Sequence, residues 1–258
     1  MITIVFSNQK GGVAKTTSAL NVAAYMARAG KRVLAVDLDP QGNLTYSMGY
    51  GPEMEIDQLE LVDVFSGGAD LEEVIRSFRG LDFLPIGLRG TAADMTYTGV
   101  GREFMLRDEL EHISENYDYC IIDTAPSLNI LTVNALTAAD YVVIPLTVDA
   151  YALTGIAQLS GFIQNVKKYT NKKLRIMGLV RTLYNPRLQT TSVLNNVIEQ
   201  SLSALRCPLL ADIRQSADIG KAQIERTDIF NYSEKSRAAE DYAALAKKIM
   251  EKAEGGAR

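Results

Sequence analysis

Short runs of apolar, often β-branched residues alternate with helical patterns along the whole chain. The apolar runs predict strands at 2–6, 33–37, 81–85, 117–123, 141–145, 174–180 and 207–212. The helical patterns predict helices at 17–29, 70–78, 102–115, 128–137, 149–168, 189–205 and 236–252. Strands that lack polar alternation are buried on both faces, which is typical of a parallel sheet covered by helices. We therefore expect an α/β fold with a mostly parallel twisted sheet, helices on both faces, and a single domain over residues 1–258.

The first predicted strand leads into a glycine-rich segment, and a helical pattern follows directly. The segment reads Ser7-Asn8-Gln9-Lys10-Gly11-Gly12-Val13-Ala14-Lys15-Thr16-Thr17. A strand, a glycine-rich turn and a helix N-terminus present backbone N–H groups and the positive end of a helix dipole to one small volume. Such a volume suits a polyphosphate, with Lys15 reaching the terminal phosphates and the Thr16 hydroxyl placed for Mg²⁺.

The segment departs from the common P-loop spacing of Gly, four residues and then Gly-Lys-Ser/Thr. Gln9 and Ala14 stand at the two glycine positions, so the remaining pattern is Lys-Gly-Gly-x-x-Lys-Thr. An alanine fits such a loop only where its backbone has negative φ and its methyl group points away from the phosphates. We therefore expect negative φ at Ala14.

Carboxylates stand at the ends of two other predicted strands. Asp37 opens the run Asp37-Leu38-Asp39-Pro40-Gln41-Gly42-Asn43, and Asp123 precedes Thr124-Ala125-Pro126. Ligands of open α/β sheets collect at the carboxyl ends of the strands, where a carboxylate orients water or hydrated Mg²⁺. Capping of the following helix is the alternative role for Asp39 and for Asp123, and both roles are compatible with one residue.

Composition narrows the class of protein. The chain has 258 residues, of which 47% are apolar and two are cysteines, Cys120 and Cys207. Two cysteines are too few for a disulfide framework, so we expect a reducing cytoplasm. No apolar run approaches the roughly 18 residues of a transmembrane helix. Because the N-terminus leads straight into a predicted strand, we also expect no signal peptide.

The charge distribution is uneven. Residues 1–166 contain 10 Lys/Arg and 21 Asp/Glu, whereas residues 167–258 contain 17 Lys/Arg and 10 Asp/Glu. Such asymmetry indicates a surface that meets a polyanion. Ordinary scatter of solvated charge is an equally good explanation until the basic residues are shown to share a face.

The sequence resembles the ParA/MinD family of deviant Walker A ATPases over nearly the whole chain. The resemblance is carried by Lys10, the extra lysine ahead of the two glycines, and by the two aspartate motifs. The resemblance implies a P-loop NTPase fold that hydrolyses ATP with Mg²⁺. It implies ATP-binding residues Lys10, Gly11, Gly12, Val13, Ala14, Lys15, Thr16 and Thr17, and a metal side of Thr16, Asp37, Asp39 and Asp123, partly through water. It also makes Lys10, Lys15 and Asp39 catalytic, with Lys10 reaching the nucleotide of a second subunit.

The same resemblance implies an ATP-dependent homodimer that binds DNA without sequence preference. Slow hydrolysis, stimulated by a ParB-like centromere-binding protein, would then partition plasmid or chromosomal DNA. Arg187 and Arg214 fall where chromosomal ParA relatives carry DNA-binding arginines, although surface arginines without a partner are the simpler alternative. We expect the protein in the cytoplasm, on the nucleoid.

Other functions of the same family are weighed against this one. A MinD-like membrane-associated positioning ATPase needs a basic amphipathic tail with bulky apolar residues, whereas residues 236–252 predict a packing helix with small residues; we expect no membrane partner. Positioning of a non-DNA cargo on the nucleoid is not excluded. An iron-protein electron carrier needs cluster cysteines, a metabolic ligase needs an acceptor pocket, and the sequence has a signature of neither. Residues 49–101 contain no motif that indicates a catalytic or binding role.

Overall fold

The computed structural model describes residues 1–51, 58–147, 149, 152–185 and 191–255. Within these ranges, eight strands form one sheet in the order β3-β4-β2-β5-β1-β6-β7-β8. The strands are β1 (Ile2–Phe6), β2 (Val33–Leu38), β3 (Arg76–Phe78), β4 (Leu81–Leu84), β5 (Tyr119–Thr124), β6 (Tyr141–Leu146), β7 (Arg175–Tyr184) and β8 (Leu209–Arg214). Neighbouring strands are parallel, apart from the antiparallel pair β3-β4. The predicted fold class is confirmed.

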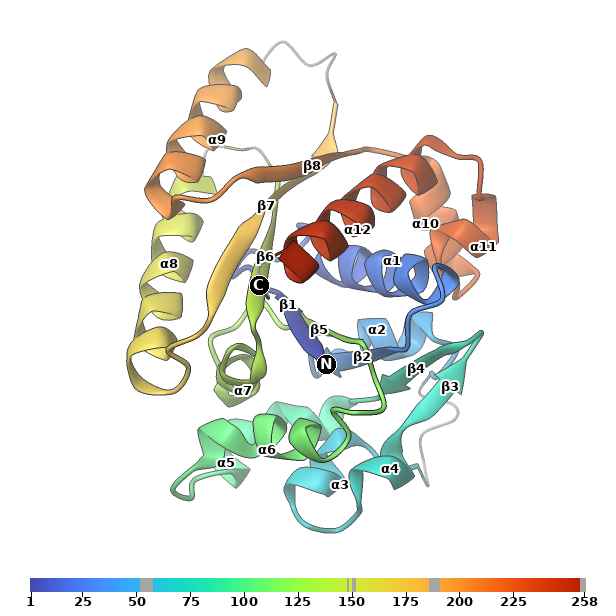
Figure 1. Ribbon diagram of the computed structural model, residues 1–258, viewed down its shortest axis with the longest axis vertical. Coiled ribbons are helices and arrows are strands. Elements are labelled where there is room, and N and C mark those ends of the chain that lie inside the picture. The colour runs from blue at the N-terminus through green and yellow to red at the C-terminus, as the bar shows by residue number, and fades with distance from the viewer. Residues whose placement is uncertain (52–57, 148, 150–151, 186–190, 256–258) are drawn as a thin grey trace.

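Helices cover both faces of the sheet (Figure 1). One face carries α3 (Leu61–Phe65), α4 (Leu71–Val74), α5 (Ala93–Thr96), α6 (Met105–His112), α7 (Ile130–Ala138), α8 (Ala152–Tyr169) and α9 (Thr191–Leu205). The other carries α1 (Lys15–Arg28), α2 (Asn43–Ser47), α10 (Ala217–Ile224), α11 (Ile229–Ser233) and α12 (Arg237–Gly255). Two 3₁₀ helices lie at Leu88–Ala92 and Arg102–Phe104.

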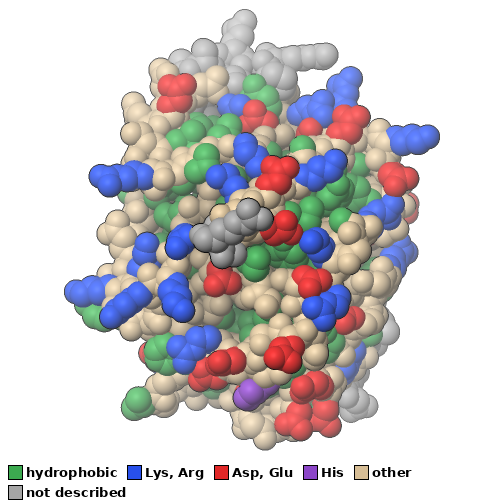
Figure 2. Space-filling model, in the orientation of Figure 1, with side chains coloured by type: hydrophobic (Ala, Val, Ile, Leu, Met, Phe, Trp, Pro, Cys, Tyr) green, Lys and Arg blue, Asp and Glu red, His purple; other side chains and the backbone are tan. Residues whose placement is uncertain are grey.

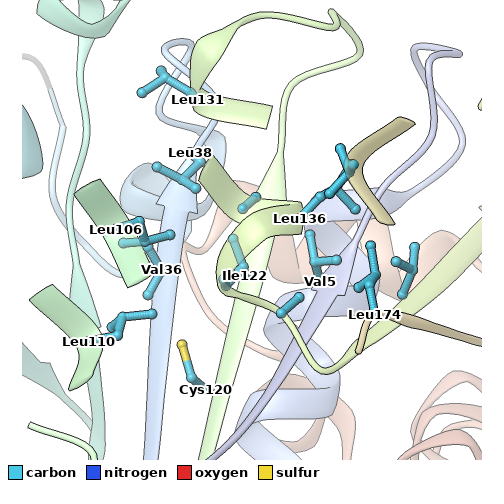
Figure 3. Packing of buried hydrophobic residues seen from close by; sticks show 14 of the residues in the cluster. Val5, Val36, Leu38, Leu106, Leu110, Cys120, Ile122, Leu131, Leu136 and Leu174 are labelled. Atoms are coloured by element: carbon cyan, nitrogen blue, oxygen red, sulfur yellow. The ribbon is translucent and has the colours of Figure 1, made fainter. Parts of the chain in front are cut away.

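The central strands divide their side chains between two apolar cores. Val5 of β1 and Ile122 of β5 pack in the core shared with α6 and α7 (Figure 3), whereas Ile4 and Ile121 pack in the core shared with α1 and α12. Successive side chains of a strand point to opposite faces, so a strand between two helical layers must be apolar at every position. This requirement explains the uninterrupted apolar runs of the sequence.

The predicted helix at 70–78 is wrong in its second half. Helix α4 ends at Val74, and β3 then pairs with β4 across a two-residue turn. Arg79 and Gly80 form this turn with φ of 53° and 80°, and positive φ at both central residues is the geometry that joins antiparallel strands tightly. The glycine at the second position of the turn is the signal that favours a hairpin over a continuing helix.

Helix α12 is a packing helix, as predicted. Its apolar side includes Tyr242, Leu245 and Ile249, which are fully buried where the helix packs against α1 and β8. In the described part of the chain, no helix combines the length and the hydropathy that a membrane crossing requires.

Candidate nucleotide-binding site

Three strand ends bring the predicted site residues to one edge of the sheet. In the strand register, Phe6 of β1 lies beside Asp123 of β5, and Asp123 lies beside Asp37 of β2. The glycine-rich loop leaves β1 directly after Phe6. The structure therefore places the loop and both aspartates side by side, as the strand-end pattern predicts.

The loop is held by hydrogen bonds at several points. The Asn8 side chain donates to the carbonyl of Pro145 at 2.7 Å and accepts from the Lys10 N–H at 3.1 Å. The Thr182 hydroxyl of β7 donates to the Val13 carbonyl at 3.0 Å. A Cβ atom added at Gly11 or Gly12 would meet no described atom beyond the adjoining residues within 4 Å, so the space in front of these glycines is open to a ligand.

Ala14 contradicts its predicted conformation. Its φ of 60° and ψ of 38° lie in the left-handed region, which a Cβ atom disfavours by about 1–2 kcal/mol. The sequence reasoning allowed an alanine only with negative φ. The structure instead retains the backbone conformation that a glycine adopts readily and fits an alanine into it, because α1 must begin at the next residue.

The N-terminus of α1 is open to an anion. Among the described residues, no side chain caps its first N–H groups, and its first turn carries no acidic residue. Lys15 is buried, and its ammonium group donates to the Lys10 carbonyl at 3.2 Å. Burial lowers the pKa of Lys15, against the opposing effect of the nearby Asp123 and Asp39 carboxylates. An anion bound beside Lys15 would raise its pKa again, because an opposite charge favours the charged form of the lysine.

Asp37 is fixed by the segment that follows it. One of its oxygens accepts from both the N–H and the hydroxyl of Thr45 at 2.8 Å, and the other accepts from the Asp39 N–H at 3.1 Å. Burial nevertheless raises the pKa of Asp37 to about 7. Asp39 is also buried, and it accepts from the Gln41 N–H at 3.0 Å. These bonds shape the 37–45 segment at the strand edge that also carries the phosphate loop.

Asp123 is the strongest candidate for a metal-facing group. It is fully buried, and within the described part of the chain neither of its carboxylate oxygens has a hydrogen-bond partner. Burial and the neighbouring Asp37 raise its pKa well above the ordinary range, while the nearby Thr16 hydroxyl and Lys15 ammonium group oppose that rise. A buried carboxylate without a partner is costly, and a cation at this position would relieve it.

The described residues contain no group of three or more His, Cys, Asp or Glu side chains arranged to hold a metal ion. Mg²⁺ is commonly bound through one or two protein carboxylates together with phosphate oxygens and water. The unpartnered carboxylate of Asp123 is suited to that role.

Lys10 points to residues of its own chain. Its ammonium group donates to the Thr147 hydroxyl at 3.1 Å and forms an ion pair with Asp149. Both side chains of the pair are about one-third exposed (36% and 34%). Sequence reasoning assigned no role in the site to Thr147, Asp149 or Thr182, because these residues lie far along the chain from the loop that they contact. It also missed Thr45, which closely follows the 37–43 motif, because nothing in the pattern indicates its contact with Asp37.

The two predicted DNA-contacting arginines have different outcomes. Arg214, at the end of β8, forms a two-pronged ion pair with Asp241 of α12 and a longer contact with Glu240. Arg187 lies outside the described residues. Contact of either arginine with DNA stays a prediction.

Comparison with known proteins agrees with this geometry. A family model described as an AAA domain (AAA_31) matches residues 1–176. The sporulation initiation inhibitor protein Soj of Bacillus subtilis is 39% identical over 251 residues, covering 95% of this chain and 97% of that protein. The chromosome partitioning protein ParA of Caulobacter vibrioides is 36% identical over 258 residues, covering 96% and 93%.

A solved structure shows the same fold with a nucleotide in place. Cobyrinic acid a,c-diamide synthase from Mycobacterium smegmatis, with bound ATP analogue and magnesium, has a TM-score of 0.85 and 31% identity, covering 99% of this chain and 97% of that one. The full-length similarity to Soj and ParA, the matching family model and the phosphate-loop geometry together show that this chain belongs to the AAA_31 family as a P-loop partitioning ATPase of the ParA/Soj type.

Proposed function

We propose that this ATPase is a dimerisation switch that partitions DNA. In the proposed cycle, ATP closes two subunits face to face, the dimer binds DNA without sequence preference, and slow hydrolysis opens it again. The observation that carries the proposal is the open N-terminus of α1, with Lys15 behind it and Lys10 at its rim. The Caulobacter vibrioides relative is named a chromosome partitioning protein, which supports a role in partitioning.

Each residue of the site has a proposed task. The N–H groups of the loop from Gly11 to Thr17 bind the phosphates, and Lys15 balances their charge. Thr16 and Asp123 would hold Mg²⁺, with Asp37 and Asp39 on the metal side through water. The metal would neutralise charge on the phosphates during transfer to water. Asp39, on the segment that Asp37 and Thr45 shape, orients the attacking water.

Lys10 acts in trans in this proposal. It must then exchange its contacts with Thr147 and Asp149 for the phosphates of the second subunit. A partly exposed ion pair contributes only about 0–1 kcal/mol, so the exchange is inexpensive. The same subunit can hold Lys10 against its own chain as a monomer and extend it when a partner brings ATP.

The partners follow from the same proposal. A ParB-like centromere-binding protein stimulates hydrolysis, and Arg187 and Arg214 contact DNA as chromosomal relatives imply. The ion pair of Arg214 with Asp241 would open or be shared with a phosphate. The protein then works in the cytoplasm on the nucleoid, where a plasmid, a chromosome or a non-DNA cargo is moved.

The test is binding to duplex DNA of random sequence, with and without ATP and Mg²⁺, over a series of salt concentrations. We expect binding only with ATP, falling as salt rises. Lys15→Gln should abolish ATP binding, whereas Lys247→Gln, which changes an exposed lysine of α12, should not. Asp39→Ala should bind ATP and DNA but turn over slowly. Normal hydrolysis by Asp39→Ala, or equal DNA binding without nucleotide, would overturn the proposed switch.

The named activity of the Mycobacterium smegmatis protein offers a second comparison. That protein is named a diamide synthase and its structure contains an ATP analogue, so transfer to an acceptor other than water is the alternative to the proposed switch, which transfers the phosphoryl group to water. Phosphate release in buffer that contains only ATP and Mg²⁺, with further acceleration by DNA and an added partner, would favour the switch over an acceptor-dependent reaction.

A further inference from the structure

One long stretch of the chain carries no acidic side chain. Residues 150–198 contain seven Lys/Arg and no Asp or Glu. The stretch includes all of α8, the turn after it, all of β7 and the first half of α9. In a protein with a net charge of −4, such a stretch leaves its exposed cations without acidic neighbours along the chain.

Five cations of this stretch form what we call the α8–β7 basic patch: Lys167, Lys168, Lys172, Lys173 and Arg175. All five side chains are exposed. Among the described residues, none of them forms an ion pair. Figure 2 shows Lys and Arg side chains gathered on the left of the face it draws, over the C-terminal end of α8 and the turn that follows.

The patch borders an open groove of about 520 Å³. Lys167, Lys172, Lys173 and Arg175 line it together with Met1, and Asp140 contributes a carboxylate. One oxygen of Asp140 already accepts from the Thr3 N–H at 2.8 Å. The groove therefore has a clear excess of positive charge.

Interaction with the dipole of α8 explains only some of the cations in the patch. Lys167 and Lys168 lie in the last turn of α8, where cations interact favourably with the helix dipole. Lys172, Lys173 and Arg175 lie beyond the end of the helix. Those three residues have no such role, and a partner of opposite charge explains them better.

We propose that the α8–β7 basic patch binds the phosphate backbone of duplex DNA. This inference rests on the proposed DNA-partitioning function and adds a DNA-contacting surface to the contacts proposed at Arg187 and Arg214. Unlike Arg214, whose charge is balanced by Asp241, the patch has cations ready to replace the counterions of DNA. The patch lies at the amino ends of β6 and β7, whereas the phosphate loop lies at the carboxyl ends of the strands. Two subunits that close over their nucleotides would leave both patches open.

The chemistry of the patch favours DNA over an acidic membrane. A membrane-binding helix needs an apolar face turned outward, but the apolar residues Ile156, Leu159, Ile163 and Val166 of α8 are buried in the core. Tyr169 is an exposed large hydrophobic residue next to the patch, and the ammonium group of Lys168 lies 4.8 Å from the centre of its ring.

The test compares two double variants with equal reduction of charge. Lys172→Gln/Lys173→Gln removes two patch cations outside α8, and Lys221→Gln/Lys247→Gln removes two exposed cations from α10 and α12. Removing one phosphate contact should reduce the steepness of log affinity against log salt by about 0.9, which is roughly eightfold in affinity at 0.1 M salt. We expect at least this reduction in the patch variant and wild-type behaviour in the control. Both should keep wild-type ATP hydrolysis in the absence of DNA.

The outcomes separate this inference from the proposed function. If wild type binds random-sequence duplex with ATP and the patch variant has the same affinity and slope, the patch does not bind DNA, while the partitioning function stands. If wild type binds no DNA in any nucleotide state, the proposed function fails, and the inference fails with it. A patch variant that no longer binds anionic phospholipid vesicles, yet binds DNA as wild type does, would also overturn the inference.

Discussion

The left-handed conformation of Ala14 predicts an unusual response to glycine. Replacing alanine with glycine normally destabilises a protein, because the unfolded chain gains about 0.4–1 kcal/mol of conformational freedom. At φ of 60°, the same replacement also removes a strain of about 1–2 kcal/mol. Ala14→Gly should therefore leave the free energy of unfolding unchanged or raise it by up to about 1.6 kcal/mol.

Ala29, at the other end of α1, provides the matched control. Its φ is −79°, so Ala29→Gly relieves no strain and should lower the free energy of unfolding by about 0.5–1 kcal/mol. The difference between the two variants cancels the effect of glycine on the unfolded chain. It should equal the strain at Ala14, about 1–2 kcal/mol in favour of Ala14→Gly.

The assay is urea unfolding of nucleotide-free protein, monitored by circular dichroism. The dependence of the unfolding free energy on urea concentration is compared among wild type and both variants. Equal slopes make the midpoints directly comparable. If Ala14→Gly and Ala29→Gly destabilise the protein equally, the left-handed backbone of Ala14 carries no strain, and the physical reason for the prediction is wrong.

Three further predictions test other parts of the structure. Thr182→Val removes the hydrogen bond to the Val13 carbonyl, and should lower the free energy of unfolding by about 1–2 kcal/mol and weaken ATP binding in calorimetry. The pKa of Asp37 is about 7 in the folded protein, against an ordinary value of 3.8. The folded state therefore binds this proton more tightly than the unfolded state does, and the free energy of unfolding falls as the pH rises through 7. Between pH 5 and 8 wild type should lose about 2–3 kcal/mol more than Asp37→Asn without nucleotide. Burial raises the pKa of the Cys120 thiol, and raises that of Cys207 to about 11, so neither should react with a disulfide reagent at about pH 8 until the protein is unfolded.

Each of these has a result that would count against it. Unchanged ATP affinity in Thr182→Val would mean that the contact with β7 does not shape the loop. Parallel pH profiles of wild type and Asp37→Asn would show that Asp37 is ionised throughout. Rapid labelling of a folded thiol would show that its part of the core opens readily.

The strands and the edge that carries the site were predictable from the sequence for a physical reason. The runs around Ile4 and Ile121 are buried on both faces, so they show an unbroken apolar pattern, and the ends of such strands must meet at one edge. Asp37 and Asp123 could therefore be placed together before the register was known. The same reasoning could not reveal the contact of Lys10 with Asp149, because that contact depends on the path the chain takes after β6.

Short helices were harder to predict, although their first residues carry a local signal. Ser216 and Asp228 accept N–H groups at the starts of α10 and α11, and each is a residue type that favours helix N-termini. Neither helix was predicted, because both are short and lack a strong apolar period. Ala14 differs from these cases: its residue type favours negative φ, and only the requirement to join the loop to α1 explains the conformation found.

The two outer strands of the sheet have a consequence for self-association. At one margin, β3 spans three residues, and at the other, β8 meets β7 with two breaks in register. Margins that are this short or irregular are poor templates for extending a sheet into a neighbouring molecule. Copies of this chain would therefore extend the sheet poorly from either margin, and we expect any pairing between them to use side-chain surfaces instead of backbone hydrogen bonds along a sheet edge.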